Sequence, residues 1–229
     1  MTTSRARLVH LVTAAVAVFA LVLQTVLVVT GASVLAETAV PPLATRLGRL
    51  VSYFTIQSNL LVAVTAVQLA RDPLRDGRWW RPVRLAAVVG ITVTGLVHFV
   101  LLRPLLDLQG PNALADVLLH LVVPLLGAGG WLLAGPRPRW SSRDAAVALL
   151  WPVLWLVWTV AVGALSGWVP YPFLDVEAEG GPAVALTCVG VTVLFLLLIA
   201  ALLALDRRLP SVPVRRSAPR PRARVATAE

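Results

Sequence analysis

Six long apolar runs divide this sequence, and they constrain its fold more than any other feature. A helix needs about 20 mostly apolar residues to cross the hydrocarbon core of a bilayer, because every backbone N–H and C=O must find its partner within the segment. Only 14% of the residues are charged, and the mean hydropathy is +0.83. The predicted spans are residues 8–30, 51–70, 85–102, 113–133, 145–165 and 183–205. We therefore predict an all-α, polytopic membrane helix bundle of about six spans.

The basic residues indicate how this bundle is oriented. All 20 are arginine, and 17 of them fall before the first run, between the second and third, between the fourth and fifth, or after the sixth. Arg46, Arg49 and Arg103 fall on the other side. Basic residues collect in the cytoplasmic loops of membrane proteins, so we expect both termini in the cytoplasm and the chain in the cell membrane. The net charge of +9 therefore reflects topology, and we expect no nucleic-acid partner.

The sequence predicts one membrane domain at residues 8–205, with a short cytoplasmic N-terminus at residues 1–7. Residues 206–229 are rich in arginine and proline and predict a disordered cytoplasmic tail. The first apolar run, at about 23 residues, is too long for the core of a signal peptide. A lone Cys188 excludes an internal disulfide, and neither a phosphate-binding glycine loop nor a familiar metal motif is present. We predict no cofactor and no metal.

Polar residues within the predicted spans gather at one depth. They are Thr55 and Asn59 on the second span, His98 on the third, and Asp116 and His120 on the fourth. Given the alternating direction of the spans and the helical rise of 1.5 Å per residue, all five fall in the outer half of the membrane. Because ionisable residues inside a span usually face the bundle interior and mark a site, the sequence predicts a shared polar pocket.

Two helical stripes and an aromatic belt accompany this pocket. Ser52 aligns with Thr55 and Asn59 at spacings of three and four, and Asn112 aligns with Asp116 and His120 at spacings of four. Tryptophan and tyrosine prefer the membrane interfaces, and we assign Trp168 and Tyr171 to the outer belt, with Trp79, Trp80, Trp131 and Trp140 at the cytoplasmic one.

The pocket residues match the parts of a nucleophilic site. A hydroxyl becomes reactive when an imidazole removes its proton and a carboxylate orients that imidazole. We expect Thr55 as nucleophile, His120 as general base, Asp116 as orienting carboxylate, and Asn59 or a nearby hydroxyl as oxyanion donor. Each has a structural alternative: Thr55 bonded to its own helix, Asn59 joining helices, Asp116 solvated, and His120 a structural histidine, although two histidines at one depth on adjacent helices favour a site.

Three segments also resemble a known family. Residues 53–60 (YFTIQSNL), 118–124 (LLHLVVP) and 168–174 (WVPYPFL) are similar, in order, to signatures of the androgen-induced gene family, which includes the androgen-dependent TFPI-regulating protein. The chain looks like a six-span bacterial member. The resemblance implies a multi-spanning hydrolase of fatty acid esters of hydroxy fatty acids, with a threonine and a histidine as catalytic residues. By motif these are Thr55 and His120, and membrane lipids and a lipid-like ester are the implied partners.

Other functions fit the same residues. In one, His98 and His120 are the axial ligands of a haem in a non-enzymatic redox protein. In another, the bundle is a small-molecule carrier or an assembly partner, with the polar cluster as binding site or interhelical contact. No internal repeat of the transporter kind is present, which weakens the carrier interpretation.

Overall fold

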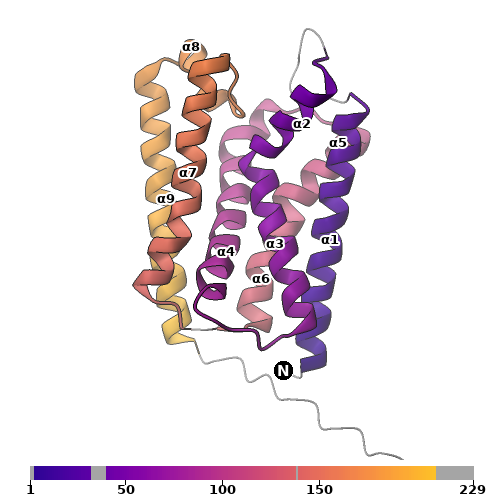
Figure 1. The fold of residues 1–229 in the computed structure, drawn as a ribbon, viewed down its shortest axis with the longest axis vertical. Coiled ribbons are helices and arrows are strands. Elements are labelled where there is room, and N and C mark those ends of the chain that lie inside the picture. Colours follow the sequence, from indigo (N-terminus) through magenta and orange to yellow (C-terminus); the bar gives the residue numbers. More distant parts are fainter. Residues whose placement is uncertain (1–2, 32–39, 138, 210–229) are drawn as a thin grey trace, which may run out of the picture.

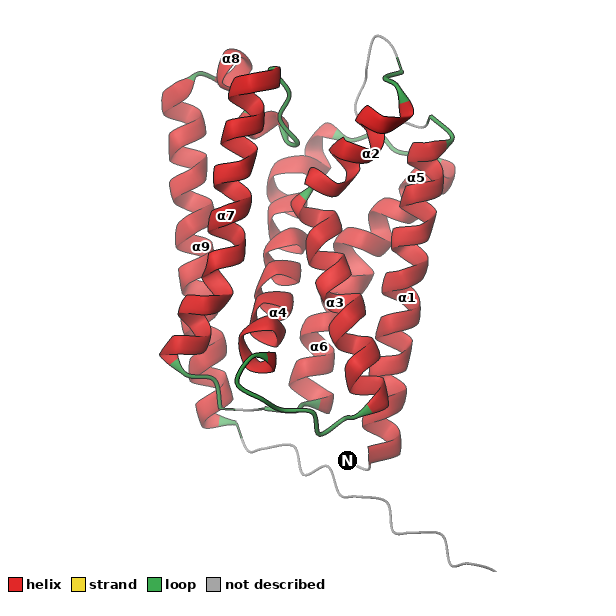
Figure 2. Ribbon diagram, in the orientation of Figure 1, coloured by secondary structure: helices red, strands yellow, loops and turns green. Residues whose placement is uncertain are grey.

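The computed structural model describes residues 3–31, 40–137 and 139–209 of the chain. Within these ranges the chain consists of helices and loops, without a strand (Figure 2). The α-helices are α1 (Thr3–Val29), α2 (Leu43–Ser52), α3 (Phe54–Arg71), α4 (Trp80–Val97), α5 (Gly110–Val117), α6 (Val123–Ala134), α7 (Ser142–Ser166), α8 (Val176–Glu179) and α9 (Gly181–Arg208). The π-helical segments are η1 (His98–Leu102) and η3 (Leu118–Val122), and the 3-10 segments are η2 (Arg103–Leu105) and η4 (Pro172–Leu174).

Five continuous helical stretches are long and apolar enough to cross a membrane. They are Thr3–Val29, Trp80–Leu105, Gly110–Ala134, Ser142–Ser166 and Gly181–Arg208. Where the sequence predicts one straight span at residues 51–70, α2 and α3 form a pair bent by 68°, which gives a sixth crossing when the pair is counted as one span. The prediction of an all-α polytopic membrane bundle is confirmed, and the bend is a feature that the sequence analysis missed.

The bend lies at Tyr53, whose backbone is extended (φ −69°, ψ 128°). α2 is short and carries Arg46 and Arg49, and charged side chains favour an interfacial position over the hydrocarbon core. Arg46 donates hydrogen bonds to the backbone oxygens of Val28 and Val29 at the end of α1, which fixes α2 across that end. α3 consequently starts as a separate helix at Phe54.

The helices pack as two groups. α1, α3, α4 and α6 form one group, and α7 and α9 stand beside it against α4 (Figure 1). Small side chains such as Ala17, Ala63 and Ala87 lie buried within the first group, where they let helix backbones approach closely. Aromatic rings join the two groups: Phe54 of α3 stacks on Trp151 of α7, with ring centroids 4.5 Å apart.

The two described chain ends lie at the same end of the bundle, with the α3–α4 and α6–α7 loops (Figure 1). We call this the arginine-rich end and the opposite one the arginine-poor end. The described arginines on its helix ends and loops are Arg5, Arg7, Arg71, Arg75, Arg78, Arg81, Arg84, Arg137, Arg139, Arg143, Arg207 and Arg208. The fold therefore gathers most of the described arginines at one end of the bundle, as the positive-inside rule predicts for the cytoplasmic end.

The predicted domain limits differ from the helix bounds at both ends. α1 begins at Thr3, so residues 3–7, predicted as a separate segment, continue the first helix. α9 extends to Arg208, so the predicted tail starts within a helix. Its residues from 210 onward lie outside the described residues.

Gly90 tests the packing between the two helix groups. A Cβ added at Gly90 of α4 would lie 2.5 Å from Cζ3 of Trp151. We predict that Gly90→Ala pushes α7 away from α4 and lowers the free energy of unfolding by about 1–3 kcal/mol, measured as thermal unfolding in detergent. Gly129→Ala is the matched control, because nothing lies within 4 Å of the Cβ added there. Equal melting temperatures for the two variants would contradict this packing.

Candidate active site

The first turn of α3 carries Thr55, and the break at Tyr53 exposes the backbone of that turn. The first N–H groups of a helix have no partner within it. Here the Thr55 N–H donates to the hydroxyl of Tyr171 at 3.1 Å, and Thr55 Oγ1 lies 3.2 Å from the same phenol oxygen. Tyr171 belongs to the loop between α7 and α9, so this loop closes over the start of α3. Both side chains are buried.

The two histidines lie in π-helical turns. η1 begins at His98 and η3 contains His120, and such turns within helices are frequent at functional sites. Pro124 has no N–H for the carbonyl of His120, four residues earlier, which favours a wider turn here. Gly95 of α4 packs against this turn, since a Cβ added there would lie 3.2 Å from the His120 carbonyl oxygen.

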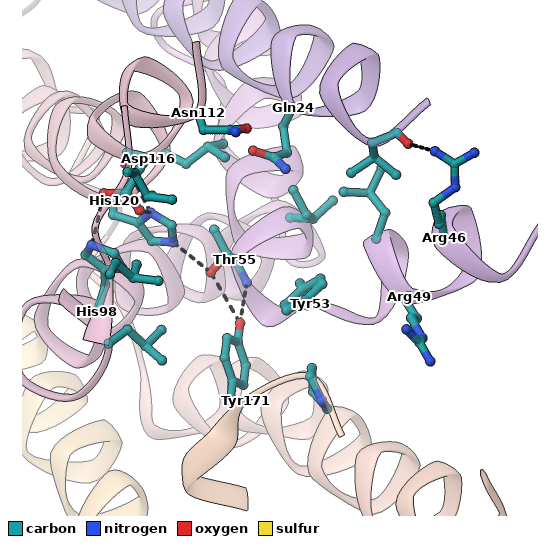
Figure 3. Close-up of a pocket in the computed structure, with 18 of the residues that line it drawn as sticks. Gln24, Arg46, Arg49, Tyr53, Thr55, His98, Asn112, Asp116, His120 and Tyr171 are labelled. Atoms are coloured by element: carbon teal, nitrogen blue, oxygen red, sulfur yellow. Dashed lines mark hydrogen bonds and ion pairs between the residues drawn. The ribbon is translucent and has the colours of Figure 1, made fainter. Parts of the chain in front are cut away.

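A chain of hydrogen bonds links Thr55 to Asp116 through His120 (Figure 3). Thr55 Oγ1 lies 3.3 Å from Nε2 of His120. Nδ1 of the same ring lies 3.0 Å from both Oδ1 and the backbone oxygen of Asp116. These acceptors favour the tautomer with its proton on Nδ1, which leaves the Nε2 lone pair facing the Thr55 hydroxyl. The order hydroxyl, imidazole, carboxylate is the one that activates a nucleophile.

His98 binds the same carboxylate from the other side. Its Nε2 lies 3.3 Å from Oδ2 of Asp116, and its ring stacks on that of His120 with centroids 3.8 Å apart and planes at 11°. The Asp116 side chain is 11% exposed. A freely solvated Asp116, one alternative from the sequence, is therefore not what the structure contains.

Asn59 has a different part from the predicted one. It is fully buried, and its Nδ2 donates to the backbone oxygens of Thr55 at 2.8 Å and Leu119 at 3.2 Å. These bonds use both amide hydrogens, so Asn59 joins α3 to η3 and has no hydrogen left for an oxyanion. This corrects the expectation of an oxyanion donor in favour of the structural alternative.

The bend also breaks one predicted stripe. Ser52 lies on α2, before Tyr53, and its hydroxyl donates to the backbone oxygen of Gly48 at 2.9 Å. Ser52 therefore lies outside the lining of the cavity beside Thr55, and Asn59, buried between α3 and η3, does not line it either. The second stripe holds, since Asn112, Asp116 and His120 all line one cavity.

This cavity, which we call the first cavity, has a volume of about 210 Å³ and lies beside the Thr55 hydroxyl (Figure 3). Its lining includes Gln24, Arg46, Arg49, Asn112, Asp116 and His120. The two arginines come from α2 at the arginine-poor end and place positive charge along one side. An oxygen-rich lipid head or ester group would find hydrogen-bond donors here.

Tyr171 is the residue of this cluster whose part the sequence analysis missed: it was assigned to the outer aromatic belt, and its hydrogen bonds to Thr55 were not predicted. Its signal was the segment 168–174, one of the three that carry the family resemblance. Burial raises the pKa of the Tyr171 hydroxyl to about 12. The group therefore keeps its proton throughout the neutral range and stays available as a hydrogen-bond donor.

The cluster could also hold a cation. His98, Asp116 and His120 each offer one ligand atom, and these atoms lie within 4.8 Å of one another, a donor set that suits zinc and related ions. The prediction of no metal rested on linear motifs, which do not find ligands from separate helices. A haem is different, because rings stacked 3.8 Å apart leave no room for a porphyrin between them.

Comparison with known proteins finds no matching family model, curated protein or solved structure. The resemblance to the androgen-induced gene family thus rests on the three segments alone and stays a prediction.

The Tyr171 hydroxyl can be followed directly, because the chain has two tyrosines. We predict that ultraviolet titration shows a tyrosinate step near pH 12, which Tyr171→Phe removes and the control Tyr53→Phe keeps. A raised pKa means that folding favours the neutral form, so its contribution to stability is present below pH 10 and declines as the pH rises toward 12. A step that survives in Tyr171→Phe would contradict the assignment.

Proposed function

We propose that this chain is a membrane-embedded hydrolase of lipid acyl esters, with Thr55 as nucleophile and His120 as general base. The observation that carries the proposal is the 3.3 Å contact between Thr55 Oγ1 and His120 Nε2, with the opposite ring nitrogen bound to Asp116. A threonine hydroxyl is weakly nucleophilic until a base takes its proton. The contact supplies that base at the required atom.

The reaction has two balanced halves. In the first, Thr55 Oγ bonds to the ester carbonyl carbon and its proton passes to His120 Nε2. The carbon–oxygen bond of the ester then breaks, and the proton moves to the departing oxygen, which leaves as an alcohol. In the second half, His120 takes a proton from water, the resulting hydroxide attacks the acyl carbon, and Thr55 regains its proton as the fatty acid departs. The sum is ester plus water giving acid plus alcohol.

Tyr171 is the best-placed donor for the negative oxygen that forms in each half. Its oxygen accepts the Thr55 N–H at 3.1 Å. Because the Thr55 hydrogen goes to His120 Nε2, the phenol hydrogen donates to Thr55 Oγ1 at 3.2 Å, next to the place where the negative carbonyl oxygen would form. Its raised pKa keeps that hydrogen in place at neutral pH. Removing one such donor typically costs about 10²–10³ in rate.

The three segments that resemble the androgen-induced gene family support the same function. Thr55, His120 and Tyr171 come one from each segment, and their side chains form a continuous hydrogen-bonded cluster. Under the resemblance the substrate is a fatty acid ester of a hydroxy fatty acid or a similar acyl ester, and the partners are membrane lipids.

The substitutions Thr55→Ala and His120→Ala test the chemistry. We predict that purified protein in detergent reacts with a fluorophosphonate probe and hydrolyses a long-chain acyl ester, and that either substitution lowers both activities at least about 10²-fold. Thr92→Ala is the matched control, because its hydroxyl bonds only to the Val88 backbone oxygen among the described residues, at 2.7 Å. Equal labelling of wild type and the two site variants would exclude the proposed mechanism.

The proposal includes an orientation in the cell membrane: arginine-rich end in the cytoplasm, active site toward the outer leaflet. In a bacterial host, we expect green fluorescent protein fused after Glu229 to fluoresce. Alkaline phosphatase fused after Ala178, in the short helix α8 between α7 and α9, should be active, and a fusion after Arg208 inactive, because the phosphatase folds only outside the cytoplasm. The reverse pattern would invert the topology.

The ligand atoms of His98, Asp116 and His120 favour one second candidate, a metal-dependent hydrolase with a cation held by these three residues. A chelator separates the two. The threonine mechanism needs no metal, so under it hydrolysis should persist after the protein is dialysed against a chelator. Three results together would establish the alternative. Activity should be lost on chelation and restored by zinc, and elemental analysis should find bound metal in the wild type but not in His98→Ala.

A further inference from the structure

A second cavity lies on the other side of Thr55. Its volume is about 130 Å³, and it runs between α4 and the α7–α9 pair. The two cavities share a boundary made of Thr55, His98, Leu102 and Tyr171, which line both. Thr55 therefore lies between the two cavities.

The second cavity has the chemistry of a hydrocarbon site. Beyond the shared boundary its lining holds no charged residue among the described ones, and most of it is aliphatic or aromatic. The hydroxyl of Thr94 is bound to Ser58 and to the Gly90 backbone, and that of Thr192 to the Cys188 backbone. An apolar cavity of about 150 Å³ can stay dry and bind a small hydrocarbon, so this space suits part of an alkyl chain.

The position of His120 decides which end of an ester belongs in which cavity. His120 lines the first cavity and is absent from the lining of the second. The departing alcohol oxygen must receive its proton from Nε2, and the hydrolytic water must give its proton to the same atom. The alcohol part of the ester and the hydrolytic water therefore belong in the first cavity. The second cavity is then left for the acyl chain.

We propose that the second cavity is the acyl-chain site, and that its length and width set the chain-length preference. The assignment rests on the proposed ester hydrolysis. Along α9 the lining extends from Thr187 to Leu196, about 14 Å at helical rise. Only 11% of the most apolar window of α7 and of α9 is buried within the bundle, so the helices that line this site also face the surrounding membrane lipid.

Filling the cavity tests the assignment without touching the catalytic groups. Cys188 lines the second cavity, while its neighbour Val189 is 59% exposed and lies outside both linings. We expect Cys188→Trp to lower kcat/KM for a hexadecanoyl ester at least about tenfold, a loss typical of a blocked apolar subsite, with a change below about twofold for a butanoyl ester. Val189→Trp, the matched control, should change neither. An equal effect of Cys188→Trp on both esters, or none, would overturn the proposal.

A binding measurement separates failure of this assignment from failure of the hydrolase proposal. Hexadecanoic acid with a terminal photoreactive diazirine should label the α7 and α9 peptides of Thr55→Ala protein, in competition with unlabelled hexadecanoic acid. Cys188→Trp should suppress this labelling, and Val189→Trp should not. If this labelling pattern is found but the protein cleaves no ester, the acyl-chain site is supported and the hydrolase proposal is rejected. If Cys188→Trp does not change the labelling, the acyl-chain site is rejected, even if the protein cleaves esters.

Discussion

The bond from the Thr55 N–H to the Tyr171 hydroxyl is the contact on which the site depends. A helix that begins inside a membrane bundle exposes N–H groups that lipid cannot satisfy, and the bend at Tyr53 creates such a beginning. Tyr171 satisfies one of these groups from a loop 116 residues away. The same phenol reaches the Thr55 hydroxyl, so one side chain both stabilises the bend and holds the Thr55 hydroxyl oxygen in place.

The sequence predicted the spans well because burial of backbone in hydrocarbon leaves a strong compositional signal. It also gathered Thr55, His98, Asp116 and His120 at one depth, since helical rise and span direction suffice for that. The bend at Tyr53 could not be predicted from the sequence. The hydrophobic pattern of a ten-residue helix such as α2 is too short to be told apart from the span that follows it. Tyr171 escaped for a related reason: a loop residue has no periodicity, and an interfacial tyrosine is ordinarily part of the aromatic belt.

Asp116 shows how the bundle accommodates a carboxylate. A charge removed from water is costly unless partners surround it, and here imidazoles from two helices bind one oxygen each. The stacked rings keep both nitrogens aimed at the carboxylate. His98 thereby gains a physical reason for its position: it places a second imidazole nitrogen against the carboxylate that His120 alone would otherwise hold.

The same arrangement explains why the two cavities differ in character. Asp116, His120 and the α2 arginines line only the first cavity, while α7 and α9 close the second with apolar rings and chains. A soluble hydrolase must exclude water from its acyl site by packing. Under the proposed function, α7 and α9 would provide that exclusion here, and hydrophilic groups would be needed only where a proton must move. Polarity on one side and hydrocarbon on the other thus follow from placing a single hydroxyl at the boundary between two helix groups.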